Sequence, residues 1–106
     1  MLTTIKKLLG IGPQTDLKEI LAQGATLVDV RTREEYAGGH IPGSIKIPLN
    51  NLESNLSKIP KNKAVIECCA SGMRSGAAKS LLASKGFTEV HNGGGWRSLG
   101  QKIGKL

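Results

Sequence analysis

The chain has 106 residues, of which 39% are hydrophobic and 22% are charged, and its formal net charge is +7. This length and composition predict one small globular domain, and they exclude a two-domain dinucleotide enzyme, a coiled coil and a disordered chain. No apolar stretch is as long as the roughly 18 residues of a membrane-spanning helix. We therefore expect a cytoplasmic protein without a membrane span.

The first half of the chain predicts a lead-in segment followed by alternating helices and strands. Residues 1–13 form the lead-in, and a single domain is expected at residues 14–106. Asp16 is a suitable N-cap for a short helix that Gly24 ends. The elements expected after the lead-in are a helix at 16–22, a strand at 25–30, one or two helical turns at 32–37, a strand at 44–47 and a short helix at 51–56.

The second half continues this alternation. The expected elements are a strand at 64–67, a helix at 75–85 that ends at Gly86, a strand at 87–91 and a last short helix around Trp96. The glycines at 93–95 are expected to allow a close backbone turn beside the preceding loop. Strands that alternate with helices predict a parallel sheet with helices on both faces.

The positive charge is concentrated in the second half. Residues 1–53 contain six basic and six acidic residues, whereas residues 54–106 contain nine basic and two acidic ones. Basic residues never run longer than two and only three aromatic residues are present, so the sequence predicts no nucleic-acid binding. The excess charge favours a small anionic ligand, and a solvated basic surface is the plainer alternative.

The two cysteines, Cys68 and Cys69, are adjacent in the sequence. Neighbouring cysteines rarely form a disulfide because the bond strains the backbone between them. The histidines lie singly, without the spacing of zinc ligands, so no metal site is expected. The pattern indicates a reduced thiol pair of which one member is reactive.

The segment 69–75 is the strongest candidate site. It follows a predicted strand and precedes a predicted helix, where open parallel sheets bind their ligands. Backbone amides, the helix N-terminus and Arg74 favour the thiolate of Cys69, and Gly72 permits a positive φ in the turn. No acidic residue occurs from Cys68 to Gly86. These features predict a nucleophilic sulfur within an anion-binding loop.

Four segments in this order resemble the single-domain rhodaneses: residues 27–31, 35–48, 69–75 and 92–96. The resemblance implies a rhodanese-like three-layer α/β/α fold with a five-stranded parallel sheet. It also implies thiosulfate sulfurtransferase activity, in which a cysteine takes a sulfane sulfur from thiosulfate or another donor and holds it as a persulfide. A persulfide enzyme of this kind needs no metal or organic cofactor.

The resemblance also assigns roles to residues. Cys69 corresponds to the nucleophile, and the loop that holds the persulfide and substrate corresponds to Ala70, Ser71, Gly72, Met73, Arg74 and Ser75. Cys68 is expected to pack at the strand end, where the family often has an aromatic residue. Asp29 and Arg31 are expected to support the structure rather than to act on substrate, and His40 is expected to stabilise a turn.

Two alternatives to the sulfurtransferase function stay open from the sequence. We expect a small anionic donor, a thiol or protein acceptor, and a monomer. A dedicated persulfide carrier with little thiosulfate turnover is the first alternative. A small phosphatase or arsenate reductase is the second, but such enzymes place five residues between cysteine and arginine, and only four separate Cys69 from Arg74. The shorter loop favours a sulfur atom over a tetrahedral phosphate.

Overall fold

Residues 16–106 are described by a computed structural model of the chain, so the predicted lead-in lies outside the described residues. Four parallel strands form one sheet in the order β2-β1-β3-β4. The strands are β1 (Thr26–Asp29), β2 (Ile45–Lys46), β3 (Val65–Cys69) and β4 (Val90–Gly95). The expectation of five strands is wrong for these residues: they contain four segments of β-favouring residues, each of which forms one strand, and the fifth was implied by the resemblance alone.

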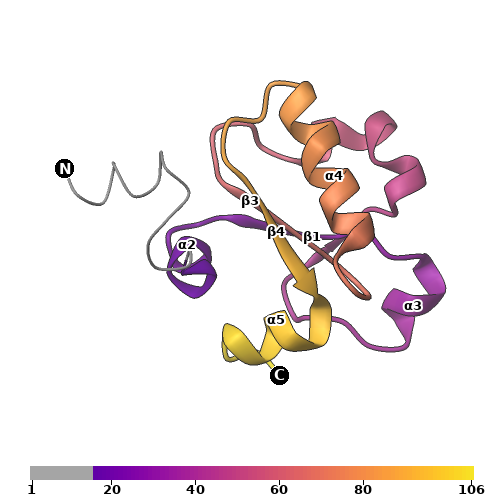
Figure 1. Cartoon of the computed structure of the whole chain (residues 1–106), viewed down its shortest axis with the longest axis vertical. Coiled ribbons are helices and arrows are strands. Elements are labelled where there is room, and N and C mark those ends of the chain that lie inside the picture. The colour runs from indigo at the N-terminus through magenta and orange to yellow at the C-terminus, as the bar shows by residue number, and fades with distance from the viewer. Residues whose placement is uncertain (1–15) are drawn as a thin grey trace.

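Helices cover both faces of this sheet, as predicted (Figure 1). Buried side chains of α4 (Met73–Ser84) pack on one face together with residues around the 3-10 helices η1 (Leu49–Asn51) and η2 (Glu53–Lys58). Side chains of α2 (Leu17–Ala22) and α5 (Trp96–Lys102) pack on the other face. The short helix α3 (Arg33–Ala37) follows β1. The fold therefore has the three predicted layers.

Alternation along β3 divides the core between the two faces. Val65 and Cys69 belong to the cluster under α4, whereas Ile66 and Cys68 belong to the cluster under α2 and α5. Successive side chains of a strand point to opposite faces of the sheet. Both faces of β3 are buried, which is why the segment reads as an apolar run.

Local sequence signals explain the helix ends. The Asp16 side chain accepts a hydrogen bond from Glu19 N at 3.2 Å, which confirms it as the N-cap of α2. Thr32 and Glu35 form a capping box at the start of α3. Gly86, with φ of 93°, follows the end of α4 in the left-handed conformation.

Three predicted boundaries are wrong. The helix expected at 75–85 begins at Met73, two residues earlier. The helix expected at 51–56 is a pair of 3-10 helices, because Asn55 departs from helical geometry with φ −125° and ψ 23°. The strand expected at 87–91 begins only at Val90, because Phe87 N donates its hydrogen bond to Leu82 O at the end of α4. This strand also continues through the glycines at 93–95 instead of ending before them.

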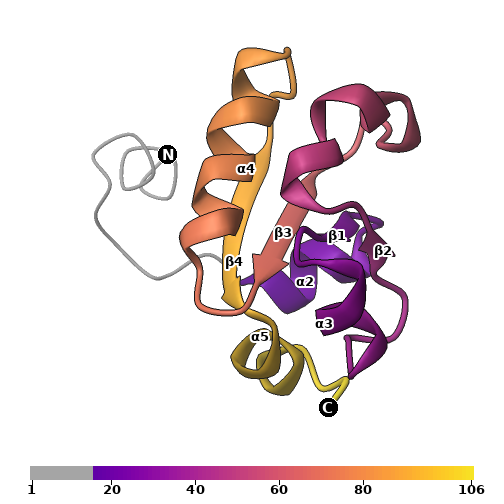
Figure 2. The same cartoon turned by 90° about the vertical axis from the view of Figure 1, so that its right-hand side faces the viewer.

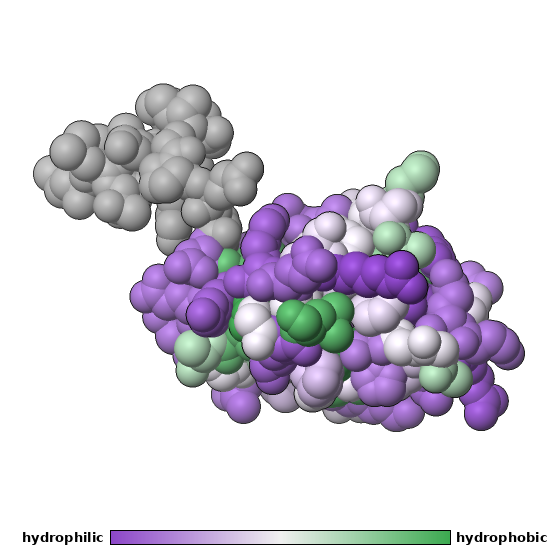
Figure 3. Space-filling view, turned by 90° about the horizontal axis from the view of Figure 1, so that it is seen from below, coloured by the Kyte–Doolittle hydropathy of each residue, from purple (hydrophilic) through white to green (hydrophobic). Residues whose placement is uncertain are grey.

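The surface seen in Figure 3 is largely hydrophilic, and hydrophobic side chains form only small separate areas on it. Within residues 16–106, no helix has the length and apolar character needed to cross a membrane.

Candidate active site

Cys69 is the last residue of β3, and the loop after it leads directly into α4. Gly72 is the N-cap of α4 and has a φ of 104°, so the predicted positive φ in the turn is confirmed. This conformation turns the backbone amides of the loop toward the end of the strand. Ala70 and Ser71 are exposed, whereas Cys69 beneath them is only 1% exposed.

The sulfur of Cys69 faces an array of hydrogen-bond donors. Gly72 N donates to Sγ at 2.9 Å and Ser75 N donates at 3.4 Å, while the Ser75 hydroxyl oxygen lies 3.4 Å from Sγ. Burial alone would raise the pKa of the Cys69 thiol. Hydrogen bonds from the Ser75 hydroxyl and from the amides of Ser75, Gly72 and Ser71 outweigh burial, so the net effect lowers this pKa below its ordinary value.

Asn92 holds this loop in place from the neighbouring strand β4. Its Nδ2 donates to Gly72 O at 3.1 Å, and its Oδ1 accepts from Gly94 N at 2.9 Å. The Ser75 hydroxyl oxygen lies 2.6 Å from Asn92 Oδ1 and 3.4 Å from Cys69 Sγ, so its one proton is shared between these two acceptors. Asn92 was not predicted from the sequence. An asparagine before a run of glycines suggests a side chain that bonds backbone groups close to it in the sequence. The contacts of Asn92 with the loop instead join residues 17 and 20 positions apart, which no local pattern predicts.

The glycines of β4 allow the backbone to approach this loop closely, as expected, although they lie within the strand rather than in a turn. A Cβ atom on Gly95 would lie 3.0 Å from Ala70 O, and one on Gly93 would lie 2.9 Å from Glu67 O. Side chains at these two positions would push β4 away from the loop and from β3.

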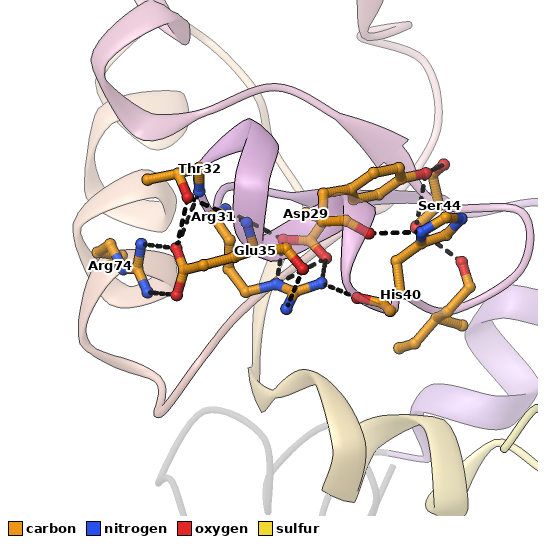
Figure 4. Close-up of polar contacts among 10 residues, drawn as sticks. Asp29, Arg31, Thr32, Glu35, His40, Ser44 and Arg74 are labelled. Carbon is orange, nitrogen blue, oxygen red and sulfur yellow. Dashed lines mark hydrogen bonds and ion pairs between the residues drawn. The ribbon is translucent and has the colours of Figure 1, made fainter.

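Arg74 is directed to Glu35 of α3 rather than to the sulfur (Figure 4). Its two terminal nitrogens donate to the Glu35 carboxylate at 2.7 and 3.0 Å. This pairing, followed by a hydrogen bond from the Thr32 amide, lowers the pKa of Glu35 to about 2. The Thr32 capping box marks the place of Glu35 at the start of α3.

Asp29 and Arg31 form a buried ion pair at the end of β1, with 2.8 Å between Arg31 Nη2 and Asp29 Oδ2. The same guanidinium donates to Gly39 O at 2.7 Å and lies 4.5 Å from the centre of the Trp96 ring. The pair therefore connects β1 with the loop before β2 and with α5. Neither side chain forms a hydrogen bond with residues 69–75 in the described part of the chain.

His40 and Ser44 lie at the opposite end of the network from Arg74 in Figure 4. Its Nδ1 is 2.9 Å from Tyr36 O, and its ring stacks on the Tyr36 ring with 3.7 Å between the centroids. The Tyr36 hydroxyl donates to Ser44 O at 2.8 Å. These contacts join α3 to the turn before β2.

Two buried groups on β3 adjoin Cys69. Burial, followed by the nearby Asp29 carboxylate, raises the pKa of Cys68 to about 12, and Cys68 packs in the core on the side of the sheet away from Cys69. Glu67 is 0% exposed, and neither of its carboxyl oxygens has a hydrogen-bond partner among the described residues. Burial raises its pKa to about 8. The sequence signal was a lone acidic residue in an apolar strand.

Residues 16–106 contain no group of three His, Cys, Asp or Glu side chains placed to bind a metal ion. The chemistry that the arrangement offers is that of a thiolate among peptide dipoles, which favours transfer of a group that carries negative charge.

Comparison with known proteins places this geometry in a family. The Rhodanese-like domain family matches residues 13–101. The chain is 41% identical over 80 residues to YqhL, an uncharacterized protein of Bacillus subtilis, and this covers 74% of the chain but only 64% of YqhL. It is 38% identical over 74 residues to the thiosulfate sulfurtransferase PspE of Escherichia coli, covering 68% of the chain and 71% of PspE.

A solved structure supports the same assignment. A rhodanese with anions from E. coli matches with a TM-score of 0.66 and 36% identity, covering 70% of this chain and 89% of that one. Because the family match extends over most of the sequence and the fold agrees, the chain belongs to the rhodanese-like domain family.

Proposed function

We propose that the protein is a sulfurtransferase that moves a sulfane sulfur from thiosulfate, or from another persulfide or polysulfide donor, to a thiophilic acceptor. Cys69 is the nucleophile and carries the sulfur as a persulfide. The observation that carries this proposal is the position of its Sγ, which accepts amide hydrogen bonds from Gly72 and Ser75. The similarity to a thiosulfate sulfurtransferase supports it.

In the first half-reaction, the Cys69 thiolate attacks the outer sulfur of thiosulfate. A new S–S bond forms with the thiolate electron pair, the S–S bond of thiosulfate breaks, and its electron pair leaves with sulfite. The thiolate, the persulfide and the departing sulfite are all anionic. The peptide dipoles of the loop therefore favour all three states.

In the second half-reaction, the acceptor attacks the outer persulfide sulfur and Cys69 leaves as a thiolate. With cyanide as acceptor the product is thiocyanate, and no proton is consumed. Cys69 is 1% exposed, so a donor reaches it with a terminal atom and not with its whole body. Thiosulfate and persulfides present such an atom.

Arg74 contributes to this reaction mainly by holding the loop. Its guanidinium pairs with the Glu35 carboxylate, and this pair joins the start of α4 to α3. The charge of Arg74 still adds positive potential near Cys69, as their mutual electrostatic influence indicates.

Thiosulfate:cyanide turnover tests the proposal. The wild-type chain is expected to form thiocyanate and to gain the mass of one sulfur atom after thiosulfate treatment. Cys69→Ser is expected to abolish both. Cys68→Ser is the matched control, since Cys68 packs on the other side of the sheet, and it is expected to retain both. Turnover that survives in Cys69→Ser contradicts the mechanism.

One observation favours a second candidate, a persulfide carrier that passes sulfur to one protein. Met73 adjoins the loop and is 84% exposed, which is unusual for a large apolar side chain and suits contact with a protein acceptor. A carrier would gain one sulfur atom from a donor yet turn over thiosulfate and cyanide poorly. Met73→Gln would then slow transfer to the protein acceptor without affecting persulfide formation.

A further inference from the structure

We propose that a basic cleft at the β2 edge of the sheet, separate from loop 69–75, binds a small polyanion. The basic cleft has a volume of about 260 Å³, and its charged lining residues are Arg33, Lys46 and Lys58. None of the residues that line it belongs to the loop that holds Cys69. The proposal therefore does not depend on sulfur transfer.

Four elements meet at this cleft. Figure 2 shows β2 between α3 on one side and the 3-10 helices η1 and η2 on the other. Arg33 is the first residue of α3, Lys46 ends β2, and Lys58 ends η2. Because they come from separate elements, the fold rather than the local sequence brings these three cations together.

The charge around the cleft is of one sign. No acidic residue lines it. Arg33, Lys46 and Lys58 form no ion pair with any residue of 16–106. Other surface cations of this basic protein are also unpaired, but these three converge on a single hollow. Such convergence raises the local concentration of anions, since a cleft focuses the field of its charges.

Neutral donors and fixed backbone complete the cleft. Asn51 and Asn55 also line it, and Asn55 Nδ2 donates to Asn51 O at 2.7 Å, which links η2 to the end of η1. The Asn51 side-chain amide forms no hydrogen bond within the described residues, so its N–H groups can donate to a ligand. Lys46 Nζ lies 5.9 Å from the centre of the Tyr36 ring, which restricts its position.

Size and charge define the ligand class. Pockets for drug-sized ligands have volumes of about 300–1,000 Å³, so this cleft suits a compact molecule. Individual exposed ion pairs contribute little, so a ligand needs two or more anionic groups to engage several cations at once. Compact diphosphates and tricarboxylates share this chemistry.

An NMR titration of the whole chain tests the proposal, with pyrophosphate, citrate and sulfate as probes at low ionic strength. We expect amide shifts at Arg33, Lys46 and residues 51–58, with pyrophosphate or citrate binding at least about tenfold more tightly than sulfate. Comparison of the two tighter probes distinguishes phosphate from carboxylate recognition. Lys46→Gln is expected to raise the Kd at least about fivefold, equivalent to roughly 1 kcal/mol. Adding salt is expected to weaken binding.

Lys102→Gln is the matched control, because it removes the same charge from α5 on the other face of the sheet. Its Kd should stay within about twofold of the wild-type value. Equal weakening by both variants, shifts confined to residues 69–75, or no shifts at all would each overturn the proposal. Tighter binding of a glutamate-rich peptide than of pyrophosphate would overturn it in favour of a protein-docking surface.

Discussion

Glu67 makes the stability of this protein sensitive to pH, and Glu67→Gln isolates that effect. The carboxyl group is buried beneath α4 without a hydrogen-bond partner in the described chain, and burial raises its pKa from 4.5 to about 8. Because the folded-state pKa is the higher one, the folded protein keeps a proton that the unfolded chain releases. Stability is therefore full below about pH 4.5 and falls as the pH rises to about 8.

The magnitude follows from the two pKa values. Each pH unit between them reduces the free energy of unfolding by about 1.4 kcal/mol, so roughly 3 kcal/mol is lost at pH 7. Glutamine has nearly the same shape as the protonated carboxyl and stays neutral. Glu67→Gln should therefore match the wild type near pH 4.5 and be more stable by roughly 3 kcal/mol at pH 7.

Urea unfolding followed by the fluorescence of Trp96 measures this difference, at several pH values between about 4.5 and 8.5. Glu34→Gln, which removes an exposed carboxylate from α3, is the control and should change stability by less than about 1 kcal/mol at every pH. If the difference in the free energy of unfolding between the wild type and Glu67→Gln does not change with pH, the reasoning is refuted.

Three further predictions follow from the site and its surroundings. Ser75→Ala removes a hydroxyl that lowers the pKa of Cys69, so the pH at half-maximal kcat/KM for thiosulfate should rise; an unchanged profile would contradict this role. Gly93→Ala places a Cβ 2.8 Å from Leu99 Cδ2 and should destabilise the fold by about 2 kcal/mol in urea unfolding, whereas Gly38→Ala, with no contact closer than 3.6 Å, should be nearly neutral. Glu35→Gln breaks the half-exposed pair with Arg74 and should cost about 0.5–1 kcal/mol at pH 7. Since the pKa of Glu35 is lowered to about 2, that difference should disappear as the pH falls from about 4.5 to 2, and a difference that persists at acid pH would count against the pair.

Much of the fold could be predicted from local sequence signals. The first three strands lie in runs of β-favouring residues, and the capping residues Asp16 and Thr32 place the starts of α2 and α3. The candidate nucleophile was also predictable, because a cysteine between a strand and a helix occupies a known ligand position. These signals involve neighbours in the sequence and therefore need no knowledge of the fold.

What the sequence did not reveal depends on contacts between distant residues. Arg74 was expected to face the persulfide, but it bonds Glu35, 39 residues away. The role of Asn92 requires that β4 lie beside β3, and the extension of that strand through its glycines requires the close approach of the loop. No local sequence pattern encodes contacts between such distant residues. The helices and strands were therefore predicted better than the side-chain contacts that join them.

The opposite orientation of the two adjacent thiols limits how the protein recovers from oxidation. A sulfenic acid can be rescued by a second cysteine of the same chain, which condenses with it to form a disulfide. Cys68 is the chain's other cysteine, and it lies within the core on the reverse side of β3. Reduction of oxidised Cys69 therefore falls to thiols supplied from solution or by other proteins, and hydrogen peroxide without such a reductant should leave Cys69 oxidised.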